Sequence, residues 1–305
     1  GLRVDAEQIV ITSGAQQAFV LISFALLKAG DTVWYENPGH IAGRDVMKAM
    51  GARVMPVPID SEGLNLDYAK NNFERPKLIF ATPSHQHPLG ITMSLARRLA
   101  LLKFASSKNS WIIEDDYDSE FRYRGRPLPA LSALDEERRV FYVGTFSKAL
   151  CSAVRLGYVV VPEWLIETFA KAMNLLGQNA SPITEAALAQ YINDGRFAEH
   201  IRKMRRLYKE RRDTLIECLN QDCSDILSFK SSDAGMHIIA DLKSGLDDEF
   251  VYKALLDDGI ESLPLSVYCL KPIKRSALVL GFSGVARKRM PSLVRKMSET
   301  LRSIH

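Results

Sequence analysis

A lysine, two hydroxyl residues and an arginine stand close together between two apolar runs of this sequence. Thr145 and Ser147 precede Lys148, and Arg155 follows it by seven positions. A lysine amine in a desolvated cleft near other cations can condense with an aldehyde to form a Schiff base. The hydroxyls and the guanidinium could hold a dianion next to that amine. The alternative is a surface lysine in a solvated loop.

A group of acids ends another apolar run. Glu114, Asp115, Asp116 and Asp118 follow one another closely, with Tyr117 among them. Neighbouring carboxylates repel, so we expect a cation beside them. A divalent metal is one candidate because hard cations take carboxylate ligands. A protonated pyridine nitrogen is a second candidate, and a solvated acidic loop is the third interpretation.

A polar turn also connects the first predicted strand to the first predicted helix. It holds Ser13, Gly14, Ala15 and Gln16. Free backbone N–H groups and the helix dipole at such a point favour a phosphate. An ordinary N-cap explains the same residues without any ligand.

A fourth polar turn lies between two prolines and holds His85, Gln86 and His87. Two histidines this close together could bind a metal, but no third ligand stands at a suitable spacing. A turn rich in proline and polar residues is the other interpretation.

An α/β fold must position these turns, because short apolar strands alternate with helical patterns through the first half of the chain. Strands nearly continuous in Val, Ile and Phe indicate a mainly parallel sheet with helices on both faces. We predict seven strands, at residues 8–12, 31–36, 53–59, 77–83, 110–116, 140–145 and 156–162. We predict helices at residues 15–30, 41–51 and 94–107. Ligands of such sheets bind outside the carboxyl ends of the strands, where all four polar turns lie.

The second half of the sequence predicts a smaller α+β domain. A charged helical region at 181–219, broken near 193–195, comes first. Strands at 234–242 and 277–283 and helices at 247–259 and 287–304 follow it. We divide the chain into a large domain at 1–175, a bridging helical region at 176–217 and a small C-terminal domain at 218–305.

The composition narrows the class of protein. The 305 residues are 47% hydrophobic and 25% charged, as in ordinary globular proteins. A net charge of +4 suits anionic small molecules and does not by itself indicate nucleic acid. Four cysteines without a C-x-x-C pair argue against a zinc site or a disulfide framework and fit a reducing cytosol. Since no apolar run approaches a membrane span, we expect a cytoplasmic protein with no membrane partner.

Together, the polar turns match the needs of pyridoxal 5′-phosphate (PLP). Its aldehyde requires a lysine, and its phosphate requires hydroxyls, backbone N–H groups and an arginine. Its ring nitrogen requires an acid that keeps it protonated, so that the ring acts as an electron sink. We therefore predict PLP as the cofactor of the large domain.

The chain also resembles a known family. From Gly1 to its end it resembles the fold-type I, aspartate-aminotransferase-like PLP proteins. The strings "TPSHQHPLGITMS", "IIEDDYDSEFRYRGRPLPAL" and "YVGTFSKAL…RLGYVV" resemble the C-terminal domain of GntR/MocR-type transcriptional regulators. In that family a winged-helix DNA-binding domain and a linker come first and alone contact DNA, so the resemblance implies either a fragment or a chain that has lost its DNA-binding domain. It also implies a homodimer.

The resemblance implies roles for individual residues. Lys148 matches the lysine that holds PLP as a Schiff base, and Asp115 matches the acid paired with the pyridine nitrogen. Tyr117 matches the tyrosine near the ring hydroxyl, and Arg155 matches the phosphate-binding arginine. Lys148, Asp115 and Tyr117 are our predicted catalytic residues. The other predicted cofactor-binding residues are Ser13, Gly14, Ala15, Gln16, His40, His85, His87, Thr145 and Ser147.

Three positions depart from the family pattern. His40 stands where an aromatic residue usually stacks on the cofactor ring, and an imidazole offers less area. His87 replaces the asparagine that touches the ring hydroxyl. Val279, three residues before Phe282, replaces the arginine that holds the carboxylate of an amino-acid substrate in true aminotransferases.

These departures favour an effector-sensing, PLP-binding domain of a MocR-type regulator, whose effector is PLP itself or a small amine or amino acid. The alternative is an active aminotransferase in which Lys148 is also the general base. A third hypothesis is a DNA-binding module, because residues 200–212 form a basic run. The interleaved Glu199 and Glu210 and the lack of an aromatic platform favour the solvated face of a helix instead.

Overall fold

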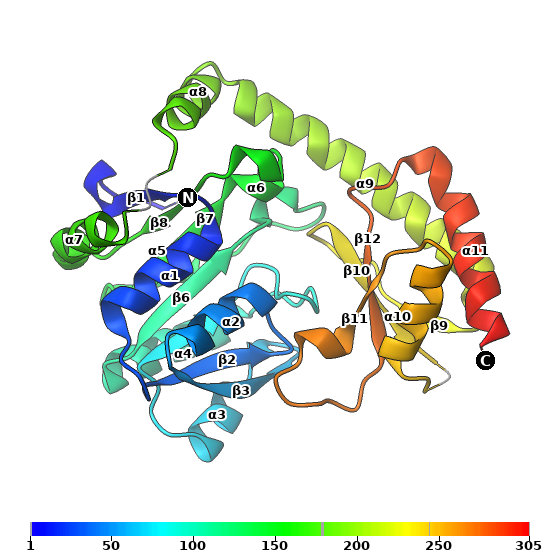
Figure 1. Ribbon diagram of the computed structural model, residues 1–305, viewed down its shortest axis with the longest axis horizontal. Helices are drawn as coiled ribbons and strands as arrows, with labels where there is room; N and C mark the ends of the chain where they lie inside the picture. Colours follow the sequence, from blue (N-terminus) through cyan, green and yellow to red (C-terminus); the bar gives the residue numbers. More distant parts are fainter. Residues whose placement is uncertain (1, 178–179, 244, 305) are drawn as a thin grey trace. The chain divides into compact units, whose positions relative to one another are not determined.

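The computed structural model describes residues 2–177, 180–243 and 245–304, which form two compact units (Figure 1). The first unit holds the chain up to His87 together with Ile91–Ser119 and Arg126–His200. The second holds Pro88–Gly90, Glu120–Gly125 and the chain from Ile201 onward. The functional division at residues 175 and 217 stays a prediction. No helix among the described residues is long and apolar enough to cross a membrane.

The first unit is built on a mainly parallel sheet, as predicted. Its strand order is β1-β8-β7-β6-β5-β2-β3-β4, and the inner strands β3, β2, β5, β6 and β7 pair in parallel. β8 is antiparallel to both β7 and β1. The sheet has one strand more than the seven predicted, because the two-residue β4 extends its edge by pairing with β3. The strands are β1 (Ile9–Thr12), β2 (Thr32–Asn37), β3 (Arg53–Asp60), β4 (Gly63–Leu64), β5 (Leu78–Ala81), β6 (Trp111–Asp116), β7 (Val140–Thr145) and β8 (Gly157–Val160).

Helices cover both faces of this sheet. In β5, Phe80 contacts Phe19 of α1 with ring centroids 5.0 Å apart, whereas Ile79 belongs to one buried cluster with Leu101 of α4. Because successive residues of a strand point to opposite faces, α1 and α4 lie on opposite sides of the sheet. The helices are α1 (Ala15–Leu26), α2 (Ile41–Ala49), α3 (Leu66–Asn72), α4 (Leu95–Lys108), α5 (Leu131–Leu134), α6 (Phe146–Ala149), α7 (Ile166–Leu176) and α8 (Pro182–Asn193).

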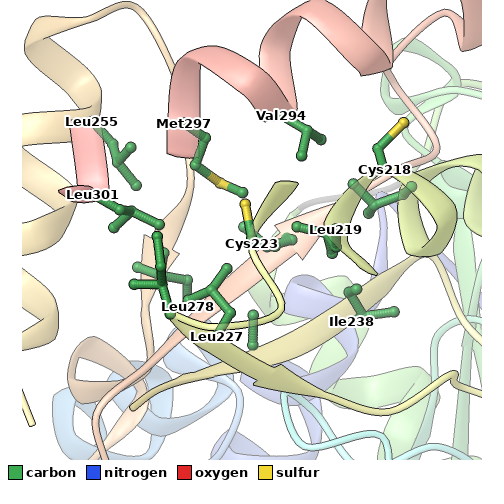
Figure 2. Packing of buried hydrophobic residues seen from close by; sticks show 14 of the residues in the cluster. Cys218, Leu219, Cys223, Leu227, Ile238, Leu255, Leu278, Val294, Met297 and Leu301 are labelled. Atoms are coloured by element: carbon green, nitrogen blue, oxygen red, sulfur yellow. The ribbon is translucent and has the colours of Figure 1, made fainter. Parts of the chain in front are cut away.

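The second unit is a four-stranded antiparallel sheet packed against helices, and the predicted α+β character is confirmed. Its strand order is β11-β12-β10-β9. The core joins Leu219 of α9, Leu255 of α10, Leu278 of β12 and Met297 of α11 (Figure 2). These elements are α9 (Arg196–Asp222), β9 (Leu227–Phe229), β10 (His237–Leu242), α10 (Asp248–Asp257), β11 (Leu263–Pro264), β12 (Ala277–Gly281) and α11 (Met290–Ser303).

Most predicted elements occur near their predicted bounds, with differences at the end of one helix and in several elements that were not predicted. α1 ends at Leu26, four residues before the predicted end at Gly30. The sequence analysis did not include α3 and α7. The predicted break in the long helical region is confirmed, because α8 ends at Asn193 and α9 begins at Arg196. Gly195 between them has a φ of 75°, a left-handed conformation that glycine adopts without strain.

Candidate functional site

Strand pairing brings two of the predicted turns together at the carboxyl end of the sheet. Thr12, the last residue of β1, and Thr145, the last residue of β7, both pair with Gly157 of β8. A Cβ atom on Gly157 would lie 2.9 Å from the backbone of Gly14 and from the carbonyl oxygen of Gly144. Only glycine therefore lets the turn after β1 approach β8 this closely.

The turn after β1 has the features of a phosphate cradle. Gly14 caps α1 with a φ of 120°, and no atom lies within 4 Å of the place where its Cβ would be. The Ser13 N–H donates to Gln17 Oε1 over 2.5 Å. The first N–H groups of a helix, here those of Ala15 and Gln16, have no intrahelical acceptor. This helix start can therefore accept an anion.

Lys148 lies in the short helix α6, directly beyond β7. Thr145 caps this helix by accepting a hydrogen bond from the Ser147 N–H at 3.2 Å, so its own hydroxyl proton stays available. Lys148 is exposed. The structure therefore differs from the desolvated surroundings that the sequence analysis expected for this lysine. The charge of Lys148 nonetheless affects the pKa of His40. Burial chiefly, and then Lys148 and Arg44, lower the pKa of His40 to about 4.

Arg155 is the predicted residue that the structure connects least with the others. It has a left-handed backbone, with a φ of 49°, two residues before Gly157. Its side chain is exposed, and none of the described contacts joins it to another predicted site residue. Its predicted role at the phosphate stays a prediction.

The first turn of α9 rests on the helix that carries Lys148. The rings of Phe146 and Phe197 lie 5.8 Å apart in an edge-to-face arrangement. The Nε2 atom of His200 lies 3.1 Å from the Ala149 carbonyl oxygen. Two contacts therefore fix α6 against α9, one on either side of the lysine.

Asp115 is deeply buried. It is 3% exposed, and its Oδ1 atom has no hydrogen-bond partner among the described residues. Burial raises the pKa of Asp115 well above its usual range, and the charges of Asp116, Glu36 and Asp118 add to this effect. A buried acceptor without a partner is costly unless a donor from outside the chain completes it.

The neighbouring acids have partners of their own. Glu114 accepts the backbone N–H groups of Leu131 at 2.8 Å and Ser132 at 2.9 Å. Asp116 accepts the Tyr142 hydroxyl at 2.6 Å. The described residues contain no group of three His, Cys, Asp or Glu side chains that could hold a metal ion.

An aromatic row leads from Asp115's strand to the loop after β2. The ring of His87 lies 5.3 Å from that of Tyr117 and 5.9 Å from that of His40, both edge-to-face. His85 contacts this row at Tyr117. Its Nδ1 atom lies 3.0 Å from the Tyr117 hydroxyl and 3.0 Å from Asp118 Oδ2. The structure thus brings together His40, His85, His87 and Tyr117, which lie after β2, β5 and β6.

Two residues of this region were missed by the sequence analysis. Glu36, the penultimate residue of β2, is 1% exposed and accepts the Thr82 N–H at 3.0 Å and the Thr82 hydroxyl at 2.5 Å. A charged residue directly after the apolar run Val33, Trp34 and Tyr35 was the signal that could have identified Glu36. Thr82 carried no signal of its own.

The fold and this set of groups define a PLP-dependent, fold-type I class of protein, and the sequence comparison agrees. Residues 1–290 match the family described as aminotransferase class I and II, and the chain belongs to that family. PLP is the cofactor that this family implies, as predicted.

Individual relatives include both regulators and enzymes. The chain is 37% identical to the probable rhizopine catabolism regulatory protein MocR of Rhizobium meliloti over 95% of its own length and 58% of that regulator's. An archaeal alanine:glyoxylate aminotransferase superposes with a TM-score of 0.92 at 29% identity, covering 100% of this chain and 77% of that one. The kynurenine aminotransferase of Pyrococcus horikoshii, solved with PMP, gives a TM-score of 0.89 at 28% identity and covers 97% and 75%.

The residues present fit PLP. The unpartnered Oδ1 of Asp115 can pair with a ring nitrogen that carries a proton. The open helix start at Gly14 and the hydroxyls of Thr145 and Ser147 can hold a phosphate. Lys148, three residues after Thr145 in α6, carries an amine that could condense with the aldehyde.

Proposed function

We propose that this chain is the PLP-binding, effector-sensing domain of a MocR-family transcriptional regulator, with PLP held as a Schiff base on Lys148. The observation that carries the proposal is the buried Asp115 carboxyl group with one oxygen unpartnered among the described residues. The 37% identity to a MocR regulator over 95% of this chain supports the regulatory part.

The chain's own groups would divide the work of binding. PLP, when bound, supplies an electron sink. Asp115, whose pKa is raised by burial, would share a proton with the ring nitrogen. The start of α1, with Thr145 and Ser147, would hold the phosphate. Tyr117 would orient the PLP ring through its hydroxyl group. That hydroxyl lies 3.0 Å from Nδ1 of His85, which fixes its position.

Val279 favours sensing over turnover. It lies in the middle of β12, paired with Ile239 and Leu263, and is 8% exposed. Leu278 and Leu280 belong to the helix-covered core, so Val279 lies on the opposite face of its sheet. A valine cannot form the bidentate pair that an arginine makes with a carboxylate. The proposed effector is therefore PLP itself or a small amine. An amino acid is also a proposed effector, but its carboxylate would have to be bound by groups other than residue 279.

Structural similarity supports the alternative, an active aminotransferase. The TM-score of 0.92 to an alanine:glyoxylate aminotransferase extends over the whole of this chain. In that case Lys148 would also move the proton as general base.

We propose that the protein acts in the cytoplasm as a homodimer. Since the chain spans only 58% of the MocR relative, we propose that DNA contact belongs to a part of the protein outside this sequence.

The first test is the absorption spectrum of the protein with PLP, beside Lys148→Ala. We expect a visible imine band that borohydride removes in the wild type and that Lys148→Ala lacks. Lys171→Ala is the matched control, because Lys171 is an exposed lysine on α7 of the same unit, and it should keep the band. A band of equal strength in Lys148→Ala would overturn the assignment.

A second measurement separates the sensor from the enzyme. We expect amines to shift the imine band without sustained release of a keto acid. Steady keto-acid production that depends on Lys148 would instead establish the aminotransferase.

A further inference from the structure

We propose that Glu36 is a positioning residue, which holds the loops carrying His40 and His87 in the arrangement that the cofactor site needs. The inference rests on the proposed PLP site and extends it to a residue outside the predicted set. It is drawn from a hydrogen-bond network that joins two loops of the first unit.

The centre of the network is the buried carboxylate. Oε1 of Glu36 accepts the Thr82 N–H at 3.0 Å, and Oε2 accepts the Thr82 hydroxyl at 2.5 Å. Oε2 also lies 3.0 Å from Nε2 of Gln86. The described partners of this carboxylate are all neutral donors of the loop after β5. The carboxylate thus acts as an acceptor for that loop.

From this centre the contacts reach both histidine loops. The Thr82 hydroxyl oxygen accepts the His87 N–H at 3.1 Å, and Gln86 Nε2 lies 2.7 Å from the His87 carbonyl oxygen. The same Nε2 lies 2.9 Å from the Pro38 carbonyl oxygen, two residues before His40. Glu36 therefore fixes the backbone on both sides of His87 and, through Gln86, the backbone that leads to His40.

The aromatic row depends on this backbone. The His87 ring lies between those of His40 and Tyr117, at 5.9 Å and 5.3 Å. His40 has further supports, because its carbonyl oxygen accepts the Tyr35 hydroxyl at 2.6 Å and its Nδ1 accepts the Gly43 N–H at 3.2 Å. Glu36 is the group that connects this supported loop to the one carrying His87.

Glu36→Gln tests the role with little change in volume. The new amide oxygen can take the place of Oε1 and accept the Thr82 N–H, but its NH₂ group then faces both the Thr82 hydroxyl and the NH₂ of Gln86. Rotating the Gln86 amide would place its oxygen against the Pro38 and His87 carbonyls. Either arrangement breaks one side of the network.

Glu114→Gln is the matched control. Glu114 is equally buried and precedes Asp115, but its partners are the backbone N–H groups of Leu131 and Ser132 and the Arg98 guanidinium at 3.9 Å, none of which belongs to a histidine loop. Both variants remove a buried carboxylate. Only Glu36→Gln is expected to act on the histidine loops.

Two readouts are needed. We expect Glu36→Gln to weaken PLP binding at least about tenfold, about 1.4 kcal/mol, while Glu114→Gln stays within about threefold of the wild type. In the protein without PLP, we expect Glu36→Gln to shift the imidazole NMR signals of His40 and His87, and Glu114→Gln to leave them in place.

The outcomes separate the two proposals. Wild-type imidazole shifts in Glu36→Gln would overturn the positioning role, whatever PLP does. Shifted histidines in a protein whose wild type binds no PLP would leave the positioning role standing and remove the proposed cofactor function. If Glu36→Gln does not fold, Thr82→Val takes its place, because it removes only the hydroxyl between Glu36 and the His87 N–H. Unchanged histidine signals in Thr82→Val would then count against the inference.

Discussion

Three consecutive acids of β6 show how strand geometry divides similar residues into different tasks. Glu114 accepts hydrogen bonds from backbone N–H groups at the start of α5, and Asp116 accepts one from the Tyr142 hydroxyl. Asp115, between them, has one oxygen without a hydrogen-bond partner among the described residues. The sequence analysis singled out the acids as a group and, through the family resemblance, Asp115 within it. It missed Glu36, since a single acid in a strand forms no pattern, and the Thr82 contact joins residues 46 positions apart.

Glu36 also predicts a pH dependence of stability. Burial raises its pKa from 4.5 to about 7, opposed by hydrogen bonds from Thr82 and Gln86. A raised folded-state pKa stabilises the protein at low pH, and this contribution is lost as the pH rises through about 7. Between about pH 5 and about pH 8 we expect the wild type to lose on the order of 2 kcal/mol more unfolding free energy than Glu36→Gln.

Urea unfolding without PLP at these two pH values measures the difference. Equal losses in the two proteins would show that Glu36 does not titrate in this range.

At the scale of elements, the fold could be predicted further than its assembly. Runs of Val, Ile and Phe identified the strands β1 to β3 and β5 to β8 because burial on both faces leaves a strong local pattern. The strand order, and the antiparallel insertion of β8 between β1 and β7, depend on pairings distant in sequence, which no local pattern contains. β4 has two residues and α3 seven, too few to show a period.

Gly157 is where element pairing and the cofactor site meet. We expect Gly157→Ala to lower stability by about 1–3 kcal/mol, because its Cβ would lie 2.9 Å from backbone atoms that cannot rotate away. It should also weaken PLP binding, since the displaced atoms belong to the turn at Gly14. Gly281→Ala is the control, because it ends β12 and has no atom within 4 Å of its added Cβ.

Calorimetry and PLP titration of both variants check this prediction. A Gly157→Ala protein as stable as Gly281→Ala would contradict the close approach of β8 to the turn.

At the scale of the whole molecule, several cations of the basic run at 200–212 are engaged in contacts within the protein. Arg212 is 1% exposed and lies 4.7 Å over the Tyr123 ring. Arg205 donates to the Glu120 carbonyl oxygen, and Lys209 pairs with Asp213 at 2.9 Å. These contacts support the interpretation of the run as part of a structural helix.

This chain alone should therefore bind DNA no more tightly than the non-specific range, with a Kd of about 10⁻⁴–10⁻⁶ M. Fluorescence anisotropy with a labelled duplex at two salt concentrations measures it. Binding well below a micromolar Kd that persists at about 0.2 M salt would revive the DNA-binding hypothesis.

α9 belongs to both units, and this has a thermodynamic consequence. Its first turn, at Phe197 and His200, rests on the helix of Lys148, while Leu219 lies in the core of the second unit. Its 27 residues extend about 40 Å as one uninterrupted, cooperatively formed helix. The two units therefore share part of one folding equilibrium. A ligand that stabilises the turn at Lys148 would also lower the frequency of local opening around Leu219. Binding would then change the local dynamics of the protein even where no atom changes its mean position.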